Sequence, residues 1–273
     1  SEIIQEQQIL TGGIPAEYAG GSGLVSKVIT KSGSNDFHGS VNYYFQNDSL
    51  VADNKHNTSS GFSAYDAAVT LGGPIIKEKL WFFSSYQKKS RDTDVTNATT
   101  GEAMRTVNRD DKLGFAKITW QPTENDRLVA SFFNDPATIS GSTSATTLNN
   151  RDQRQVQGGD NYKLDYTRDM GDLRVNAYAF RHEGELSTYA ADLSTRNDVA
   201  FRNASPAPTT AMRSQGGTGS ALATSRNRDE IGFSGEYFLE TASMGTHTIK
   251  SGFSISENEY VEDSIVTGPD KAR

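Results

Sequence analysis

The chain has 273 residues, of which 34% are hydrophobic and 10% aromatic, and its formal net charge is −7. It contains no cysteine and no dense run of Lys and Arg, which excludes disulfides, thiolate metal sites and a cysteine nucleophile and removes the electrostatic footprint of a nucleic-acid partner. No stretch approaches the ~20 consecutive apolar residues of a spanning helix, so a membrane role is open only to a β-barrel.

The chain starts at Ser1 rather than at Met, and we expect it to be an internal segment of a longer protein. Its first part, residues 1–34, is rich in glycine, which tolerates positive φ and a close approach of neighbouring backbone. By itself such a cluster is also compatible with a simple turn between two strands. The residues of this motif that we single out are Gly12, Gly13, Pro15, Glu17, Tyr18, Gly20, Gly23, Thr30 and Lys31.

From residue 36 onward the chain alternates between apolar and polar residues in short runs. In the first run Phe37, Val41, Tyr43 and Phe45 share one face, because successive side chains of a strand point to opposite sides. The same pattern returns along the chain, separated by stretches rich in turn residues. It predicts nine strands at about residues 36–46, 63–74, 80–90, 110–121, 127–135, 160–169, 172–185, 228–241 and 246–259.

Two of these segments alternate less cleanly than the others. Residues 80–83 read Leu-Trp-Phe-Phe, so both faces of that strand are apolar. Between Phe115 and Ile118 the apolar residues change phase, which an extra residue in a β-bulge would explain.

Short and long connections between the predicted strands alternate along the chain. The short ones lie near residues 75–79, 122–126, 168–172 and 242–246, and the long polar ones cover residues 47–61, 90–109, 136–159 and 187–225. An up-and-down barrel in an outer membrane has short turns on the periplasmic side and long loops outside. A soluble β-sandwich also carries long loops, but it has no reason to place them at every second connection.

Three segments resemble a known family. LTGGIPAEYAGGSG (10–23) and VITKSGSNDFHGS (28–40) resemble the end of the plug in TonB-dependent receptors, most closely in their Oar-like branch. TLGGPIIKEKLWFF (70–83) resembles the second and third barrel strands of that branch with their turn. The likeness covers about residues 8–90. It departs from the usual pattern at Leu24 and at Ser26–Lys27.

The resemblance implies an all-β fold, namely an antiparallel up-and-down transmembrane β-barrel preceded by the C-terminal end of a plug domain. Residues 1–34 would be the plug end and residues 35–273 the N-terminal part of the barrel. Plugged receptors use about 22 strands, so nine strands make the barrel incomplete. The segment that contacts TonB would precede Ser1, and the rest of the barrel would follow Arg273.

The search for catalytic chemistry gives no candidate, and we expect neither an enzyme nor a bound cofactor. The histidines His38, His56, His182 and His247 have no spacing typical of a metal pair. Asp110 and Asp111 are adjacent, so in a strand they point to opposite faces rather than into one site.

Aromatic residues near strand ends indicate the interfacial girdles of a barrel. We assign this role to Tyr43, Phe45, Trp81 and Trp120. A soluble core would instead favour more Leu, Ile and Val on the apolar face.

Three functions remain open at this point. The leading hypothesis is energised uptake of a scarce ligand, such as a carbohydrate or a chelate, across the bacterial outer membrane. The partners would be outer-membrane lipid, the TonB complex (through segments outside this chain) and an unknown extracellular ligand. The alternatives are an Oar-like surface protein acting in adhesion or protein export, and a soluble carbohydrate-binding module.

Overall fold

The computed structural model describes most of the chain as β-structure. The residues described are 2–12, 14, 18, 23–52, 61–96, 103–141, 151–194, 201–202, 214–215, 217–218, 220–242 and 245–266. A short 3-10 turn, η1 (Asp48–Leu50), follows the first strand of the main sheet. None of the helical structure in these ranges is long and apolar enough to cross a membrane.

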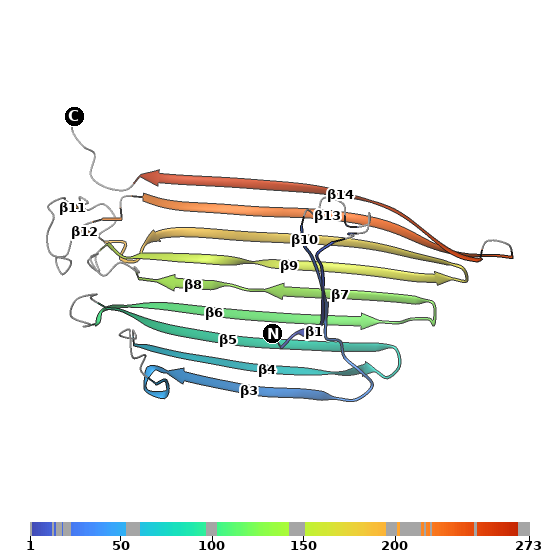
Figure 1. Cartoon of the computed structure of the whole chain (residues 1–273), viewed down its shortest axis with the longest axis horizontal. Coiled ribbons are helices and arrows are strands. Elements are labelled where there is room, and N and C mark those ends of the chain that lie inside the picture. The colour runs from blue at the N-terminus through green and yellow to red at the C-terminus, as the bar shows by residue number, and fades with distance from the viewer. Residues whose placement is uncertain are drawn as a thin grey trace.

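The main sheet is an antiparallel meander whose strand order follows the chain (Figure 1). Its strands are β3 (His38–Asn47), β4 (Phe62–Ile76), β5 (Leu80–Thr96), β6 (Ala103–Trp120), β7 (Asp126–Asn134), β8 (Ala137–Ser140), β9 (Gln153–Met170), β10 (Leu173–Ala190), β13 (Ser220–Thr241) and β14 (Gly245–Val266). This order confirms the predicted up-and-down β fold.

β7 and β8 occupy a single position in the sheet, because both lie between β6 and β9. The break falls at Asp135 and Pro136, and Pro136 has no backbone N–H for a ladder. The side chain of Asp135 instead accepts a hydrogen bond from the Gly159 N–H at 2.9 Å, and the Lys112 N–H donates to the Pro136 carbonyl at 2.9 Å. Over the residues that the structure describes, the sheet therefore has nine strand positions, as the alternation predicts.

Short and long connections lie at opposite ends of the strands. Residues 77–79, 121–125, 171–172 and 242–244 make the short ones. We call this the turn end, and the other the loop end. Two of these turns need positive φ, which Gly171 adopts at 65° and Glu78 at 63°. A left-handed conformation suits glycine and costs energy for glutamate.

The loops are shorter than predicted, because the strands continue into polar sequence. β5 runs to Thr96 and β6 starts at Ala103, where we expected a loop from residue 90 to 109. Likewise, β10 continues to Ala190 and β13 already begins at Ser220. A ladder is held by backbone hydrogen bonds, so it needs no apolar face to continue. Polar cross-strand contacts support it, such as Asn108 to Asp92 at 2.7 Å.

The bulge expected near Phe115 is absent. β5 and β6 keep one register from Leu80 opposite Trp120 to Val95 opposite Arg105, so Phe115 and Ile118 lie on opposite faces. Phe115 packs against Phe83 with ring centroids 6.1 Å apart, and Phe83 is only 1% exposed. The change of phase in the sequence therefore reflects a strand with apolar residues on both faces.

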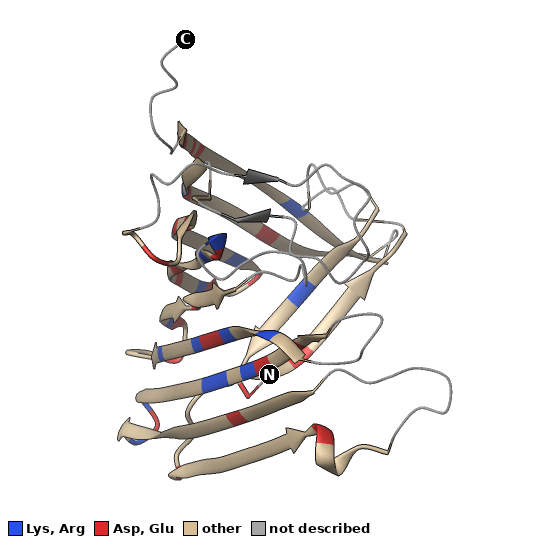
Figure 2. Ribbon diagram, turned by 90° about the vertical axis from the view of Figure 1, so that its left-hand side faces the viewer, with Lys and Arg blue, Asp and Glu red and all other residues tan. Residues whose placement is uncertain are grey.

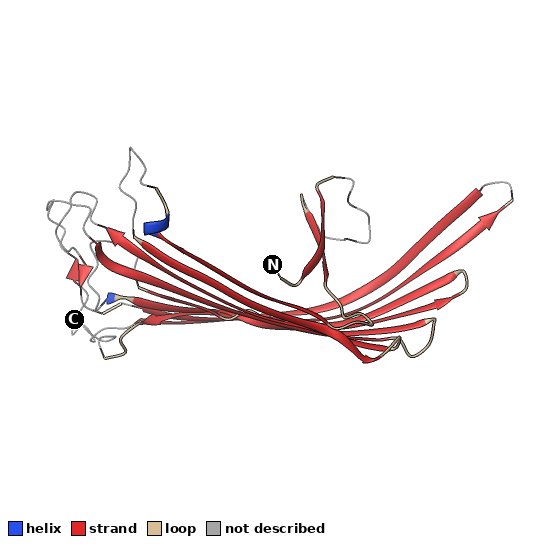
Figure 3. Ribbon diagram, turned by 90° about the horizontal axis from the view of Figure 1, so that it is seen from below, coloured by secondary structure: helices blue, strands red, loops and turns tan. Residues whose placement is uncertain are grey.

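A separate hairpin lies on the side of the main sheet that Phe83 and Phe115 face. β1 (Ile4–Leu10) pairs with β2 (Val25–Thr30), and the hairpin crosses the concave side of the trough-shaped main sheet (Figure 3). We call the side of the sheet that it covers the hairpin face and the opposite side the outer face. A third small sheet joins β11 (Phe201–Arg202) to β12 (Ser214–Gln215).

Candidate functional site

The outer face of the sheet is apolar and exposed. Val41 on β3 is 82% exposed and Ile231 on β13 is 57% exposed. The strand registers place their apolar neighbours on the same side. Large exposed residues of this face are Val41, Tyr43, Phe45, Val69, Leu71, Ile118, Trp120, Leu164, Ile231, Phe233 and Tyr237. An apolar surface of this extent needs a partner other than water.

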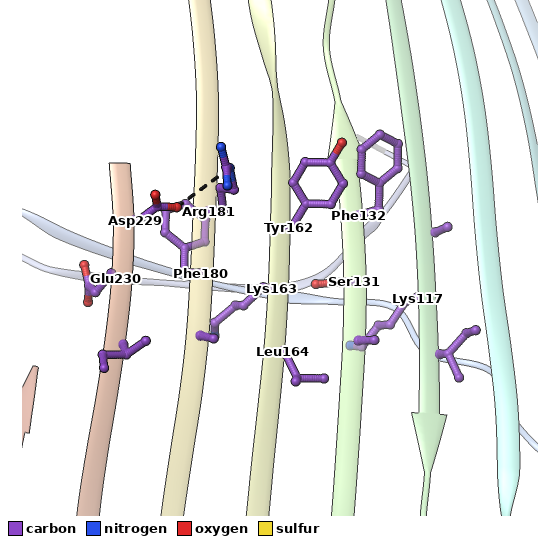
Figure 4. Close-up of a pocket in the computed structure, with 15 residues that line it drawn as sticks. Lys117, Ser131, Phe132, Tyr162, Lys163, Leu164, Phe180, Arg181, Asp229 and Glu230 are labelled. Carbon is purple, nitrogen blue, oxygen red and sulfur yellow. Dashed lines mark ion pairs between the residues drawn. The ribbon is translucent and has the colours of Figure 1, made fainter. Parts of the chain in front are cut away.

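A shallow hollow of about 680 Å³ lies in the middle of this face (Figure 4). Small side chains, including Ala116, Ala130 and Ala179, contribute to its lining. The rings of Phe132 and Tyr162 stand side by side at one end, with centroids 5.0 Å apart. The hollow has the shape and polarity that suit a hydrocarbon chain.

Charged residues mark where the apolar band ends. At one edge of the hollow Arg181 lies 3.8 Å from Asp229 and 2.7 Å from Glu183 (Figure 4). The apolar stretch of β13 on this face, from Ile231 to Leu239, covers nine residues, or about 26 Å for its eight intervals at ~3.3 Å each along the strand. Tilted strands of this length match the apolar band of an outer-membrane barrel.

The strand registers place charged side chains on the hairpin face of the same strands, and Figure 2 marks the charged residues along the ribbon. Most of them are paired with an opposite charge on their own or a neighbouring strand. The ion pairs are Lys89–Asp66, Arg109–Asp111, Lys163–Asp165, Arg174–Asp169, Arg228–Glu230 and Lys250–Glu236. The two faces therefore meet different surroundings, one apolar and one aqueous or protein-filled.

The hairpin is tied to this charged face through Lys117 of β6. Its Nζ donates to the carbonyl oxygen and to Oγ1 of Thr30, both at 3.1 Å. Thr30 ends β2, and the next residue, Lys31, closes the hairpin by donating its N–H to the Ile3 carbonyl at 2.8 Å. Two residues of the predicted glycine-rich motif thus lie where the hairpin meets the sheet.

The segment that follows the hairpin is fixed to the first short turn of the sheet. Asn35 Oδ1 accepts two hydrogen bonds at 2.8 Å, from the Glu78 N–H and from Trp81 Nε1. Gly33 passes so close to the backbone of β4 and β5 that a Cβ would collide with the carbonyl oxygens of Phe82 and Gly73. We call residues 31–35 the joint.

The structure places the remaining motif residues as follows. Gly12 follows β1, Tyr18 lies between the two strands of the hairpin, and Gly23 precedes β2 with φ of 99°. Gly13, Pro15, Glu17 and Gly20 lie outside the described residues.

Three of the four predicted girdle aromatics lie on the outer face. They are Tyr43, Phe45 and Trp120, and Tyr43 stacks on Tyr65 with ring centroids 6.4 Å apart. Trp81 instead lies on the hairpin face, where its indole N–H bonds to Asn35. The interfacial role of the other three stays a prediction.

Sequence reasoning missed Gly33, Asn35 and Lys117. Gly33 and Asn35 lie inside the segment 28–40 that resembles the family, so this resemblance could have pointed to them. Lys117 is a single cation in the otherwise apolar run from Leu113 to Trp120, and such a residue indicates a polar contact on one face of a strand.

At the loop end, Arg105 and Asp152 form an ion pair at 2.7 Å with side chains only 3% and 16% exposed. Burial raises the pKa of the Asp152 carboxyl, and the Arg105 guanidinium acts in the opposite direction. Nearby, Arg151 donates to the carbonyl of the buried Gly217 at 2.8 Å. Within the described residues, no group of three or more His, Asp or Glu side chains is placed to hold a metal ion.

Comparisons with known proteins agree with this two-faced sheet. A family of outer-membrane β-barrel domains matches residues 29–111. The TonB-dependent transporter Oar of Myxococcus xanthus is 31% identical over 203 residues, which are 70% of this chain and 19% of Oar. The probable TonB-dependent siderophore receptor PirA of Acinetobacter baumannii is 25% identical over 216 residues, 76% of this chain and 26% of PirA. The chain is related to the TonB-dependent receptors of the bacterial outer membrane.

Solved structures show the same fold. The outer-membrane transporter YddB of Escherichia coli superposes with a TM-score of 0.63 at 9% identity, covering 97% of this chain and 41% of YddB. The crystal structure of PirA gives a TM-score of 0.59 at 17% identity, covering 95% of this chain and 35% of PirA. The predicted family, barrel fold and outer-membrane location are confirmed. The chain spans only about a fifth to a quarter of the curated relatives that it matches.

Proposed function

We propose that this chain forms one side of a plugged barrel in a TonB-dependent receptor that takes up a scarce ligand across the outer membrane. The observation that carries this proposal is the hairpin lying across the charged face while the opposite face stays apolar. A barrel of about 22 strands holds a plug in its lumen, and its outside carries the apolar band that lipid requires. The inner-membrane TonB complex would supply the energy, through segments outside this chain.

In this proposal residues 1–34 are the end of the plug and residues 35–273 are the N-terminal part of the barrel wall. The hairpin strands β1 and β2 pair only with each other, whereas β3 starts the meander. Within the described residues, β3 and β14 are the edges of the sheet. Unpaired backbone groups at an edge are not tolerated in lipid, so we propose that further strands of the full protein close the barrel.

The outer face would contact lipid, and the loops at the loop end would face the cell exterior and meet the ligand. A siderophore appears in the name of PirA, and it is a candidate here only as one kind of chelate. A carbohydrate is the other candidate class that we retain.

Growth on a limiting nutrient tests the proposal directly. The full-length receptor would be deleted and restored in the native bacterium, and accumulation of candidate chelates and carbohydrates would be measured with and without a working TonB. We expect at least one nutrient whose uptake needs both the receptor and TonB. Loss of cell adhesion or protein export, with unchanged uptake of every nutrient, would instead support the Oar-like surface role and overturn the transport proposal.

A further inference from the structure

A recess of about 670 Å³ lies on the hairpin face near the loop end, between η1 and strands β3 to β6. Its lining includes Tyr44, Gln46, Lys89, Arg91 and Arg109. This size is in the range of small-molecule sites in proteins. The recess lies toward the strand ends that we propose to face the cell exterior.

Two of the three cations in this recess already have a carboxylate. Arg109 makes a two-pronged contact with Asp111, from Nε and Nη2, each at 2.9 Å. Lys89 lies 3.8 Å from Asp66, whose oxygens also accept from Gln87 at 2.7 and 2.9 Å. These pairs hold the cations in place without removing all their remaining donors.

Arg91 differs, because no carboxylate of the described residues lies within ion-pair distance of it. Its Nε donates to Thr93 Oγ1 at 3.3 Å, and its guanidinium lies over the Phe62 ring at 5.2 Å. A guanidinium stacked on an aromatic ring is held in one plane. Within the described part of the chain, its two terminal nitrogens donate no hydrogen bond.

The register places two arginines of the recess opposite each other, and Asp111 offsets only part of their repulsion. Arg91 and Arg109 are directly opposite each other on β5 and β6 and share the hairpin face. Like charges directly opposite in a sheet destabilise it. An oxyanion between the two guanidinium groups would reverse the sign of this interaction, and Arg forks match carboxylate and phosphate oxygens in geometry.

We infer that Arg91 and Arg109 bind an anionic oxygen group, a carboxylate or a phosphate, of the ligand that enters the barrel. Tyr44 lines the same recess. The inference deepens the proposed uptake function and rests on it for the direction from which the ligand comes. The binding itself depends only on the recess.

Calorimetric titration of the purified full-length receptor tests this site. The probes are citrate for carboxylates, inorganic pyrophosphate for phosphates, and maltose as an uncharged comparison. We expect one of the two anions to bind, with affinity that falls as salt rises, and R91Q to weaken it about tenfold, which is ~1.4 kcal/mol. R181Q is the matched control, because Arg181 is an arginine of the outer face with two acidic partners.

The outcomes separate the inference from the proposed function. Failure of both anions to bind, or equal weakening by R91Q and R181Q, would overturn the anion site. A folded R91Q receptor is verified by its thermal unfolding, and R91K should recover part of the affinity. Anion binding together with nutrient uptake that is unchanged without TonB would support the anion site and overturn the transport proposal.

Discussion

The outer face and the hairpin face are built from alternate residues of the same strands, yet they follow different rules. On β13 the outer residues Ile231 and Phe233 are exposed and apolar. Their neighbour Glu230 points to the hairpin face, where its carboxylate accepts hydrogen bonds from the Tyr178 hydroxyl at 2.5 Å and from Arg228. The backbone is common to both, so the difference lies in the medium that each face meets. Lipid accepts apolar side chains without specific partners, whereas a face that meets water or a second element of the chain requires paired charges.

The largest effect is expected from a charge moved between the two faces. Phe233 and Ser234 are adjacent on β13 and point to opposite sides, and both are exposed. In a bilayer F233K should lower the free energy of unfolding by about 2–4 kcal/mol, because a charge near the middle of the lipid face is costly. S234K should change it little, since its side chain joins the polar face.

Urea unfolding of the full-length receptor in lipid vesicles measures this difference. Equal losses for the two variants would contradict the assignment of faces. The Phe253 ring lies 6.2 Å from that of Phe233, so F233L serves as the control for lost packing.

The second-largest effect is expected at the joint, where Gly33 lies directly against the backbone of β4 and β5. G33V would force a side chain against the carbonyl oxygens of Phe82 and Gly73, and overpacking typically costs about 1–3 kcal/mol. G12V is the matched control, because a Cβ at Gly12 has nothing within 4 Å. Limited proteolysis should cut the hairpin of G33V faster than that of G12V, and similar rates would refute a tight joint.

Asn35 should contribute a slightly smaller amount through hydrogen bonds alone. N35A leaves the Glu78 N–H and the Trp81 indole N–H without their acceptor. Both bonds are exposed and water can replace the partner, so the loss should be about 1–2 kcal/mol, the net contribution of two ordinary hydrogen bonds. A double-mutant cycle with W81F isolates the indole bond. If the two losses simply add in thermal unfolding, the bond seen between these side chains contributes nothing.

The same contrast explains which features could be predicted from the sequence. The outer face is periodic, so Val41, Tyr43 and Phe45 were assigned to one side correctly. On the hairpin face Trp81, Phe83 and Phe115 break the alternation, because Trp81 bonds to Asn35 and Phe83 packs against His38 and Phe115, contacts that only the folded chain brings together. The polar ladders beyond residue 90 also escaped prediction, since backbone pairing without an apolar face leaves no pattern.

The smallest effect is expected at the contact between Lys117 and Thr30, which holds the hairpin rather than the sheet. K117M removes the two hydrogen bonds at 3.1 Å while keeping most of the side-chain volume, and their net loss should be about 1 kcal/mol. Because the strand ladder of β6 is untouched, this loss should appear as faster amide hydrogen exchange in β1 and β2, with unfolding of the barrel unchanged. K163M is the control, since Lys163 lies on the same face but pairs with Asp165 of its own strand. Equally accelerated exchange in both variants would mean that the hairpin is stabilised by the overall charge of the hairpin face and not by Lys117 in particular.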